Sequence, residues 1–309
     1  MVARHACALD ALLVSETFDG DVYLNEPLSR HTTYHIGGPA RYFVQVGSLG
    51  ALKSLVEACS REGVPWMPFG RGSNVLVSDE GFDGVMVLLG RDFRTCRYDE
   101  AEHRFYVGAG VALSTVVQEA FHRSLAGLEF AVGTPGTVGG ALRMNAGSRD
   151  TWIGNQVVSV TSYSPARGFI KRSGAEVQWG YRSSSFAPDE IILECTLSVE
   201  PADPFFIRGK MESNLAKRRN NQPLSSPSCG SVFKNPKGQS AAVLVEGAGC
   251  KGLRIGGAQV SEKHANFIVN ENEATAHDVR SLMELVQAKV YKRYGIQLQT
   301  EVKFVGFAS

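Results

Sequence analysis

The chain has 309 residues, 43% of them hydrophobic, and its 32 basic and 31 acidic residues give a net charge of +1. This length and composition are typical of a globular protein of roughly one to three domains. The balanced charge excludes a general attraction to nucleic acid or to an anionic membrane, so any anionic ligand must be held by a local cluster of donors.

The chain carries no membrane-spanning segment and no paired-cysteine motif. No window approaches the roughly 18 uninterrupted apolar residues of a membrane helix, and the early apolar stretch 6–14 is short and broken by Asp10, unlike a signal peptide. We therefore expect a cytoplasmic protein with no membrane insertion. We also expect a monomer and, from the balanced charge, no nucleic-acid partner. The cysteines form no CxxC pair, so we expect reduced thiols and no metal site.

Apolar spacing along the chain predicts an alternation of helices and strands. Helical spacing begins at Leu49 and again at Leu113, and the second helix is expected to end before Gly127. Short runs rich in β-branched residues predict strands between the helices. The predicted strands are Val85–Leu89, Phe105–Ala109, Val157–Tyr163 and Ile191–Val199.

The C-terminal third contains a linker and the strongest helix signal. Pro201–Phe205 reads as a linker before a helix over Ile207–Leu215. Thr275 and Asp278 form a capping-box pattern that predicts a helix ending at Gly295. A final strand is expected over residues 302–307, and the whole is an α+β chain.

The most informative segment is the run Gly127–Gly147, GLEFAVGTPGTVGGALRMNAG, with six glycines in 21 residues. Glycine within a helix or strand costs about 0.5–1 kcal/mol relative to alanine, so we predict neither element here. Bare backbone of this kind suits a flat or polyanionic ligand. A set of tight turns at a domain edge is the alternative.

A second glycine cluster lies in the segment 68–77, PFGRGSNVLV. Consecutive amides at Gly70, Gly72, Ser73 and Asn74 could form a nest for a pyrophosphate. The segment lacks the Lys-Ser/Thr of a P-loop, and a tight turn is the alternative. Two such clusters about sixty residues apart favour one long ligand that spans both.

Together these motifs resemble the UDP-N-acetylenolpyruvoylglucosamine reductase family, whose members are FAD enzymes of peptidoglycan synthesis. The resemblance covers almost the whole chain, in its shorter form without an extra substrate loop. The motifs that carry it, in chain order, are HTTYHIGGPA at 31–40, GRGSN at 70–74, GTPGTVGGA at 133–141, GYRSSSF at 180–186, PSCGSVFKNP at 227–236 and TEV at 300–302.

The resemblance implies a fold and a set of domains. It implies an α+β protein with a two-domain FAD-binding unit of the vanillyl-alcohol-oxidase/PCMH type and a C-terminal α+β substrate-binding domain. The implied boundaries are 1–82, completed by about 297–309, for the first FAD-binding subdomain, 83–204 for the second and 205–296 for the substrate domain.

The resemblance also implies that FAD is held without a covalent bond and that NADPH is the hydride donor. Related oxidases tether the flavin through a histidine or cysteine near the phosphate loop, whereas this loop has Arg71, Ser73 and Asn74. The implied cofactor-binding residues are Gly70, Arg71, Gly72, Ser73, Asn74, Gly133, Thr134, Pro135, Gly136, Thr137, Gly139, Gly140, Ala141 and Asn145.

The family's reaction dictates what its catalytic residues must do. Hydride reaches the terminal carbon of an enol ether that bears a carboxylate, and the resulting enolate then takes a proton. Arg182 matches the family arginine that grips the carboxylate, Glu301 matches the active-site glutamate, and Ser231 matches the serine acid. Serine is a weak acid, so Lys234 or a water is expected to assist it. Without the resemblance, Arg182 reads as a surface ion pair and Glu301 as a solvated carboxylate at a strand start.

The nucleotide end of the substrate requires positive charge, which Lys217-Arg-Arg219 supplies at the end of a helix. Such residues also simply complement the helix dipole. The implied substrate-binding residues are Tyr181, Arg218, Gln222, Lys234 and Asn235, and His264 and Asn266 are further polar candidates.

The chain departs from the family pattern at Thr134, at Lys303 and at Ser148-Arg149-Asp150. Two other functions stay open at this point. One is another FAD oxidoreductase of the same fold, such as a sugar or lactone oxidase. The other is a non-catalytic protein that binds FAD or a nucleotide sugar.

Overall fold

The structure is a computed structural model that describes residues 8–148 and 151–307. Arg149 and Asp150, part of one departure from the family pattern, lie outside the described residues. The chain divides into two compact units. Unit 1 comprises Met1–Leu24, Tyr42–Gly70 and Gly84–Leu215, and unit 2 comprises Asn25–Arg41, Arg71–Asp83 and Ala216–Ser309. The three-domain division remains a prediction.

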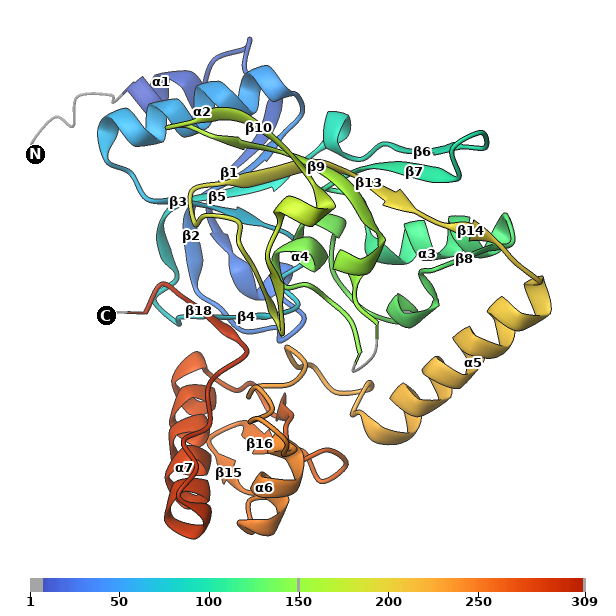
Figure 1. Ribbon diagram of the computed structural model, residues 1–309. Coiled ribbons are helices and arrows are strands. Elements are labelled where there is room, and N and C mark those ends of the chain that lie inside the picture. Colours follow the sequence, from blue (N-terminus) through green and yellow to red (C-terminus); the bar gives the residue numbers. More distant parts are fainter. Residues whose placement is uncertain (1–7, 149–150, 308–309) are drawn as a thin grey trace, which may run out of the picture. The chain divides into compact units, whose positions relative to one another are not determined.

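Unit 1 contains a five-stranded antiparallel sheet with the order β10-β9-β13-β7-β6 (Figure 1). Its apolar side packs against α3 and α4, and buried side chains such as Phe105, Val116 and Leu197 belong to one core there. The elements are β6 (Cys96–Asp99), β7 (Arg104–Gly108), β9 (Val157–Ser164), β10 (Gly168–Ser173), β13 (Ile191–Ser198), α3 (Leu113–His122) and α4 (Val138–Arg143).

A four-stranded sheet has the order β1-β2-β5-β3, and its strands β1, β2 and β5 contain the points where the division between the units falls. In unit 1, α2 packs its buried face, with Leu52, Leu55 and Val56, into a second core. The elements are α1 (Ala8–Leu13), β1 (Gly20–Pro27), β2 (Pro39–Val46), α2 (Leu49–Glu62), β3 (Trp66–Phe69) and β5 (Phe82–Leu89).

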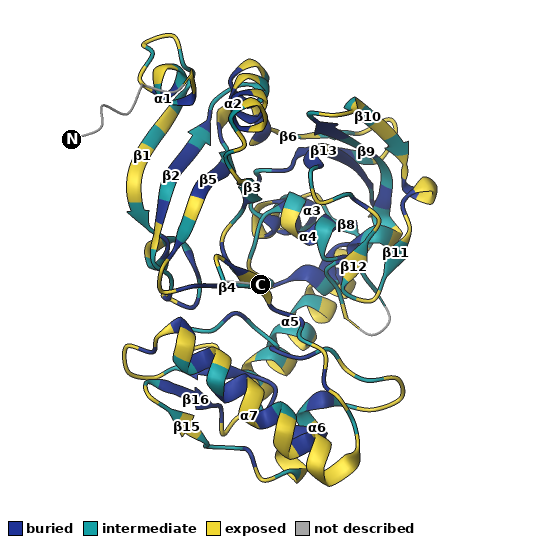
Figure 2. Ribbon diagram, turned by 90° about the vertical axis from the view of Figure 1, so that its left-hand side faces the viewer, coloured by how far each residue is buried: buried dark blue, intermediate teal, exposed yellow. Residues whose placement is uncertain are grey.

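Unit 2 has its own core, built on the long helix α7 (Figure 2). Val279, Leu282, Met283, Val286 and Val290 recur at helical spacing on its buried face. The elements of this unit are α6 (Ala241–Gly247), α7 (Ala276–Tyr294), β15 (Arg254–Ile255), β16 (Ala258–Val260) and β17 (Ile268–Asn270), with the parallel pair β4 (Val75–Val77) and β18 (Lys303–Val305).

The remaining elements are short, apart from α5 (Pro204–Asn221), which runs across the division between the units. They are the strand pairs β8 (Leu125–Ala126) with β14 (Glu200–Pro201) and β11 (Trp179–Gly180) with β12 (Ser183–Ser184), and the 3-10 helices Leu28–His31, Arg91–Phe93, Glu129–Ala131, Ile153–Gln156 and Gly174–Glu176.

The α+β class is confirmed, and most predicted elements exist. The capping box of α7 is present in full, and Gly295 ends this helix in the left-handed conformation with φ +68°. The predicted linker before α5 is shorter than expected, because the helix already begins at Pro204. Proline is favoured in the first helical turn, where its missing N–H costs nothing.

The prediction that the glycine run forms no helix is wrong for Val138–Arg143, which is α4. Thr137 caps this helix, because its side chain accepts a hydrogen bond from the Gly140 N–H. Val138, Ala141 and Leu142 are buried. The cap and this burial outweigh the cost of two helical glycines.

The thiols among the described residues are free, and four of the five, Cys59, Cys195, Cys229 and Cys250, are buried. None of the helices in the described chain combines the length and the apolar character that a membrane crossing requires.

A buried carboxylate holds several elements of unit 1 together. The side chain of Glu190 is fully buried, and it accepts hydrogen bonds from Arg172 on β10 and from Ser162 on β9. Arg167 lies 3.2 Å from the same carboxylate. Burial favours the neutral carboxyl, but the hydrogen bonds outweigh burial and hold the pKa of Glu190 below its ordinary value.

We predict that Glu190→Gln lowers the free energy of unfolding by roughly 3 kcal/mol at pH 7, because it leaves Arg172 without its counter-charge. The native carboxylate has a lowered pKa, so its contribution is complete above the ordinary carboxyl range and is lost as the pH falls through the lowered value. Urea unfolding of both proteins at several pH values checks this. A stability difference that stayed constant from about pH 7 to pH 3 would contradict it.

Candidate active site

The two glycine clusters meet at Thr137 in unit 1. A Cβ atom added to Gly70 would lie 2.9 Å from Thr137 Oγ1. Any larger residue at 70 would therefore push against the N-cap of α4. The proximity expected from sequence is thus present between Gly70 and the middle of the glycine run.

The glycines of α4 differ in what they face. A Cβ on Gly139 would lie 3.0 Å from Ala109 Cβ and 3.2 Å from Ala109 O, so Gly139 lets the helix approach β7 closely. A Cβ on Gly140 would meet only Thr137 Oγ1, at 3.5 Å. Gly140 therefore leaves an open face, whereas Gly139 is required by packing.

The turn before α4 offers hydrogen-bond donors. The N–H groups of Val138 and Gly139 donate to Val111 O and Ala109 O, both at 2.9 Å. Among the described residues, none accepts a hydrogen bond from the N–H groups of Gly136 or Thr137. Free amides beside an open glycine face fit a ligand with phosphate or flavin oxygens, so the residues present suit FAD.

Arg182 lies in the turn between β11 and β12, also in unit 1. Its backbone is left-handed, with φ +52°, and its Nη1 donates to Gly147 O at 3.0 Å. The guanidinium also lies 5.5 Å from the centre of the Tyr181 ring, which is 52% exposed. The structure therefore places the predicted arginine against the end of the glycine run.

Ser231 and Glu301 lie on neighbouring extended segments of unit 2. The Glu301 N–H donates to Val232 O at 2.8 Å, and Phe233 forms a bridge with Thr300. On the other side, Ser231 forms a bridge with Phe267, and the Val232 N–H donates to Asn266 O. Backbone pairing thus places the predicted serine and glutamate on adjacent segments.

Asn74 joins the same set through its side chain. Its Nδ2 donates to Glu301 O at 3.3 Å, and its carbonyl accepts from the Lys303 N–H at 3.0 Å. The loop before it contains Gly72, with φ +57°, where a Cβ would lie 2.5 Å from His31 O. The positive φ and the close approach to His31 therefore explain why position 72 is a glycine, without a bound ligand.

The environment of Glu301 includes a thiol. Burial raises the pKa of Cys229 to about 12, and the negative charge of Glu301 contributes to the rise. Glu301 itself is only 8% exposed. The carboxyl group therefore sits in a largely dehydrated position.

The predicted substrate residues occupy three places in the chain. Arg218 is in the last turn of α5, and Gln222 follows it, with its N–H on Arg218 O. Lys234 continues the Ser231 segment, and Asn235 Oδ1 accepts from the Ala241 N–H at the start of α6. Tyr181 lies beside Arg182 in the other unit.

The polar candidates His264 and Asn266 have partners within the fold. His264 Nδ1 accepts from the Asn266 N–H at 3.2 Å, and burial lowers the pKa of the ring below its ordinary value. The Asn266 amide bonds with Phe233 on both sides, through the Phe233 N–H and carbonyl. These two residues therefore support the segment that carries Ser231.

The sequence motif HTTYH at 31–35 contains two residues whose role was not predicted. Tyr34 is fully buried, and its hydroxyl donates to Ile268 O at 2.8 Å. Thr33 Oγ1 donates to Ser228 O at 2.7 Å. Thr33 therefore holds the loop that leads to Ser231, and Tyr34 holds β17. The signal available in the sequence was an aromatic residue set among threonine, histidine and glycine residues.

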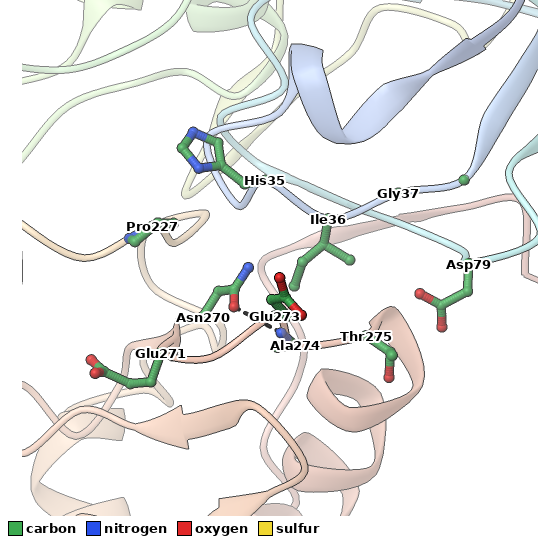
Figure 3. A pocket seen from close by; sticks show the side chains of 11 residues that line it. His35, Ile36, Gly37, Asp79, Pro227, Asn270, Glu271, Glu273, Ala274 and Thr275 are labelled. Atoms are coloured by element: carbon green, nitrogen blue, oxygen red, sulfur yellow. Dashed lines mark hydrogen bonds between the residues drawn. The ribbon is translucent and has the colours of Figure 1, made fainter.

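Unit 2 also has an open pocket of about 480 Å³ (Figure 3). Its lining includes His35, Asp79, Glu271 and Glu273. The Asp79 carboxylate accepts hydrogen bonds from the Ala276 and His277 N–H groups at the start of α7. Three carboxylates repel phosphate, so this pocket does not suit a nucleotide.

Two family models match the chain. Residues 40–173 match an FAD binding domain, and residues 222–305 match the C-terminal domain of UDP-N-acetylenolpyruvoylglucosamine reductase. Together they confirm the implied combination of a cofactor-binding part and a distinct C-terminal domain.

Named relatives cover nearly the whole chain. A UDP-N-acetylenolpyruvoylglucosamine reductase of Heliobacterium modesticaldum is 43% identical over 95% of this chain and 93% of its own. One from Syntrophotalea carbinolica is 39% identical over 96% and 99%. The crystal structure of the Thermus caldophilus reductase, 34% identical, matches with a TM-score of 0.79 over 93% of this chain and 98% of its own. The chain belongs to the UDP-N-acetylenolpyruvoylglucosamine reductase family.

Proposed function

We propose that this protein is an NADPH-dependent flavoenzyme that reduces UDP-N-acetylglucosamine enolpyruvate to UDP-N-acetylmuramate in peptidoglycan precursor synthesis. The observation that carries the proposal is the backbone pairing of Glu301 with Val232, because it places the buried residue Glu301 on the segment next to the one that carries Ser231. The full-length similarity to named reductases supports the same reaction.

In this proposal, the open face of Gly140 and the free amides of Gly136 and Thr137 hold FAD, with Gly70 and the following loop on its phosphates. When bound, FAD supplies the hydride, which comes from NADPH. Gly139 contributes by letting α4 pack on Ala109. The remaining predicted contacts, from Arg71 to Asn74 and from Gly133 to Ala141, belong to the same two loops.

Arg182, Glu301 and Ser231 act on the substrate. The planar fork of Arg182 binds the carboxylate in bidentate fashion and stabilises the enolate charge, which a lysine would do less well. Glu301, when protonated, donates a hydrogen bond to the same charge. Ser231 Oγ gives its proton to the carbon that bears the carboxylate. Arg218, Gln222, Lys234, Asn235 and Tyr181 bind the rest of the substrate.

An anaerobic absorbance experiment tests the proposed function. We expect the purified protein to show a flavin band that NADPH bleaches and that the enolpyruvyl nucleotide restores. Acid precipitation should release the flavin, because the proposed binding is non-covalent. A flavin that NADPH bleaches but that this substrate does not reoxidise would exclude the reductase activity.

We predict that Ser231→Ala binds FAD and is reduced by NADPH as the wild type is, but is reoxidised by the enolpyruvyl substrate roughly 10²–10⁴-fold more slowly, the usual contribution of a general acid. Stopped-flow absorbance of the two half-reactions measures this. Ser226→Ala, in the same loop with its side chain exposed toward Glu271, is the matched control. Unimpaired reoxidation would remove Ser231 from the mechanism.

The two helical glycines give a second prediction. Gly140→Ala should keep or raise stability by up to about 1 kcal/mol, since alanine is the better helix former and only an ordinary contact results, yet it should weaken FAD binding. Gly139→Ala should instead destabilise the protein, because its Cβ meets Ala109 at 3.0 Å.

Thermal melting of both apoproteins and FAD titration by fluorescence measure these effects. Equal FAD affinity in Gly140→Ala and the wild type would place the cofactor away from this face of α4.

A further inference from the structure

The hairpin that carries Arg182 is too small to hold its own shape. Strands β11 and β12 pair at only two positions, Trp179 with Ser184 and Gly180 with Ser183. An isolated two-stranded hairpin is marginal at best in water. Arg182 also has a left-handed backbone, with φ +52°, which persists only where surrounding contacts impose it.

Those contacts come from the end of the glycine run, 143–147. Ser184 Oγ donates to Arg143 O at 2.8 Å, and Asn145 Nδ2 donates to Gly180 O at 3.0 Å. The guanidinium of Arg182 adds its bond to Gly147 O. Figure 2 shows β12 close to α4, the helix that leads into this segment.

Asn145 supports the hairpin from two sides. While Nδ2 binds Gly180, its Oδ1 accepts from the Gly154 N–H at 3.1 Å. Gly154 in turn lies against the Trp179 ring, where an added Cβ would be 2.6 Å from the indole. One amide therefore fixes the carbonyl of β11 and the surface on which its tryptophan rests.

The surroundings of Asn145 leave little room for another contact. The residue is 4% exposed, and its backbone is left-handed, with φ +44°. Asparagine tolerates this conformation better than most residues. Its identity is therefore explained by the backbone and by its two protein partners, without a bond to the cofactor.

We infer that Asn145 is a positioning residue, which orients Arg182 for the substrate carboxylate by anchoring the hairpin, and that it does not contact FAD itself. The inference rests on the proposed function only for the role of Arg182. A bidentate guanidinium must be aligned to within a few tenths of an ångström, so a loosened hairpin slows the step that Arg182 assists.

Two variants distinguish the hydrogen bonds of the Asn145 side chain from the requirement for a residue that tolerates a positive φ. Asn145→Asp keeps an acceptor for the Gly154 N–H but turns an oxygen toward Gly180 O. Asn145→Gly removes both bonds and tolerates the positive φ. Asn214→Asp is the matched control, because it also loses an amide-to-carbonyl bond in unit 1, from Nδ2 to Glu129 O at 3.1 Å.

Hydrogen–deuterium exchange tests the anchoring without substrate. We expect the peptide covering residues 179–186 to exchange at least several-fold faster in both Asn145 variants and at the wild-type rate in Asn214→Asp. Unchanged exchange in the Asn145 variants overturns the inference, whatever the protein's activity.

Half-reaction kinetics test the consequence. We expect both Asn145 variants to retain FAD and normal reduction by NADPH, with reoxidation by the enolpyruvyl substrate slowed about tenfold. In the Arg182→Ala background, Asn145→Asp should add little further slowing, since both changes act through one guanidinium. Fully multiplicative effects, or loss of FAD with normal reoxidation of the retained holoprotein, overturn the inference. Failure of the wild type to be reoxidised overturns the proposed function instead, while the exchange result still decides the anchoring.

Discussion

A carboxylate remains charged inside a protein only where donors replace its lost water, and Glu190 is such a group. Its partners come from β9, β10 and the turn at Ala187, while Arg143, at the end of α4, donates to the carbonyls of Phe186 and Ala187 and of Glu190 itself. The antiparallel sheet and the glycine-rich helix are thereby joined at one buried charge. In the sequence, the hairpin with Arg182 lies between Arg172 and Glu190, the two residues that this ion pair joins.

The glycine run contacts two separate parts of unit 1, the residue Ala109 and the hairpin of β11 and β12. Gly139 closes the gap to Ala109, whereas Gly140 leaves its face open. The segment after the helix holds β11 and β12 through Asn145 and Arg143. One stretch of backbone therefore presents an open face at its middle and anchors the hairpin with Arg182 at its end.

Local signals in the sequence predicted α7, with its Thr275 cap and Gly295 exit, because these depend on neighbouring residues alone. They did not predict α4, since its stability comes from burial of Val138 and Leu142 in a core made by distant strands. The motifs indicated Ser231, Glu301 and Arg182 as site residues. They could not indicate the hydrogen bonds of the Asn145 side chain, because its partners are backbone groups of glycines 9 and 35 residues away.

The parallel pairing of β4 with β18 has a consequence for the order in which unit 2 forms during synthesis. Asn74 and Glu301, joined beside this pair, are 227 residues apart in the chain, and Tyr34 and Ile268 are 234 apart. The early segments must therefore leave the ribosome with apolar residues such as Leu76 and Val77 unpaired and wait for their partners. At typical rates of about 5–20 residues per second, that wait lasts on the order of ten seconds or more, during which these strand edges remain open to intermolecular pairing.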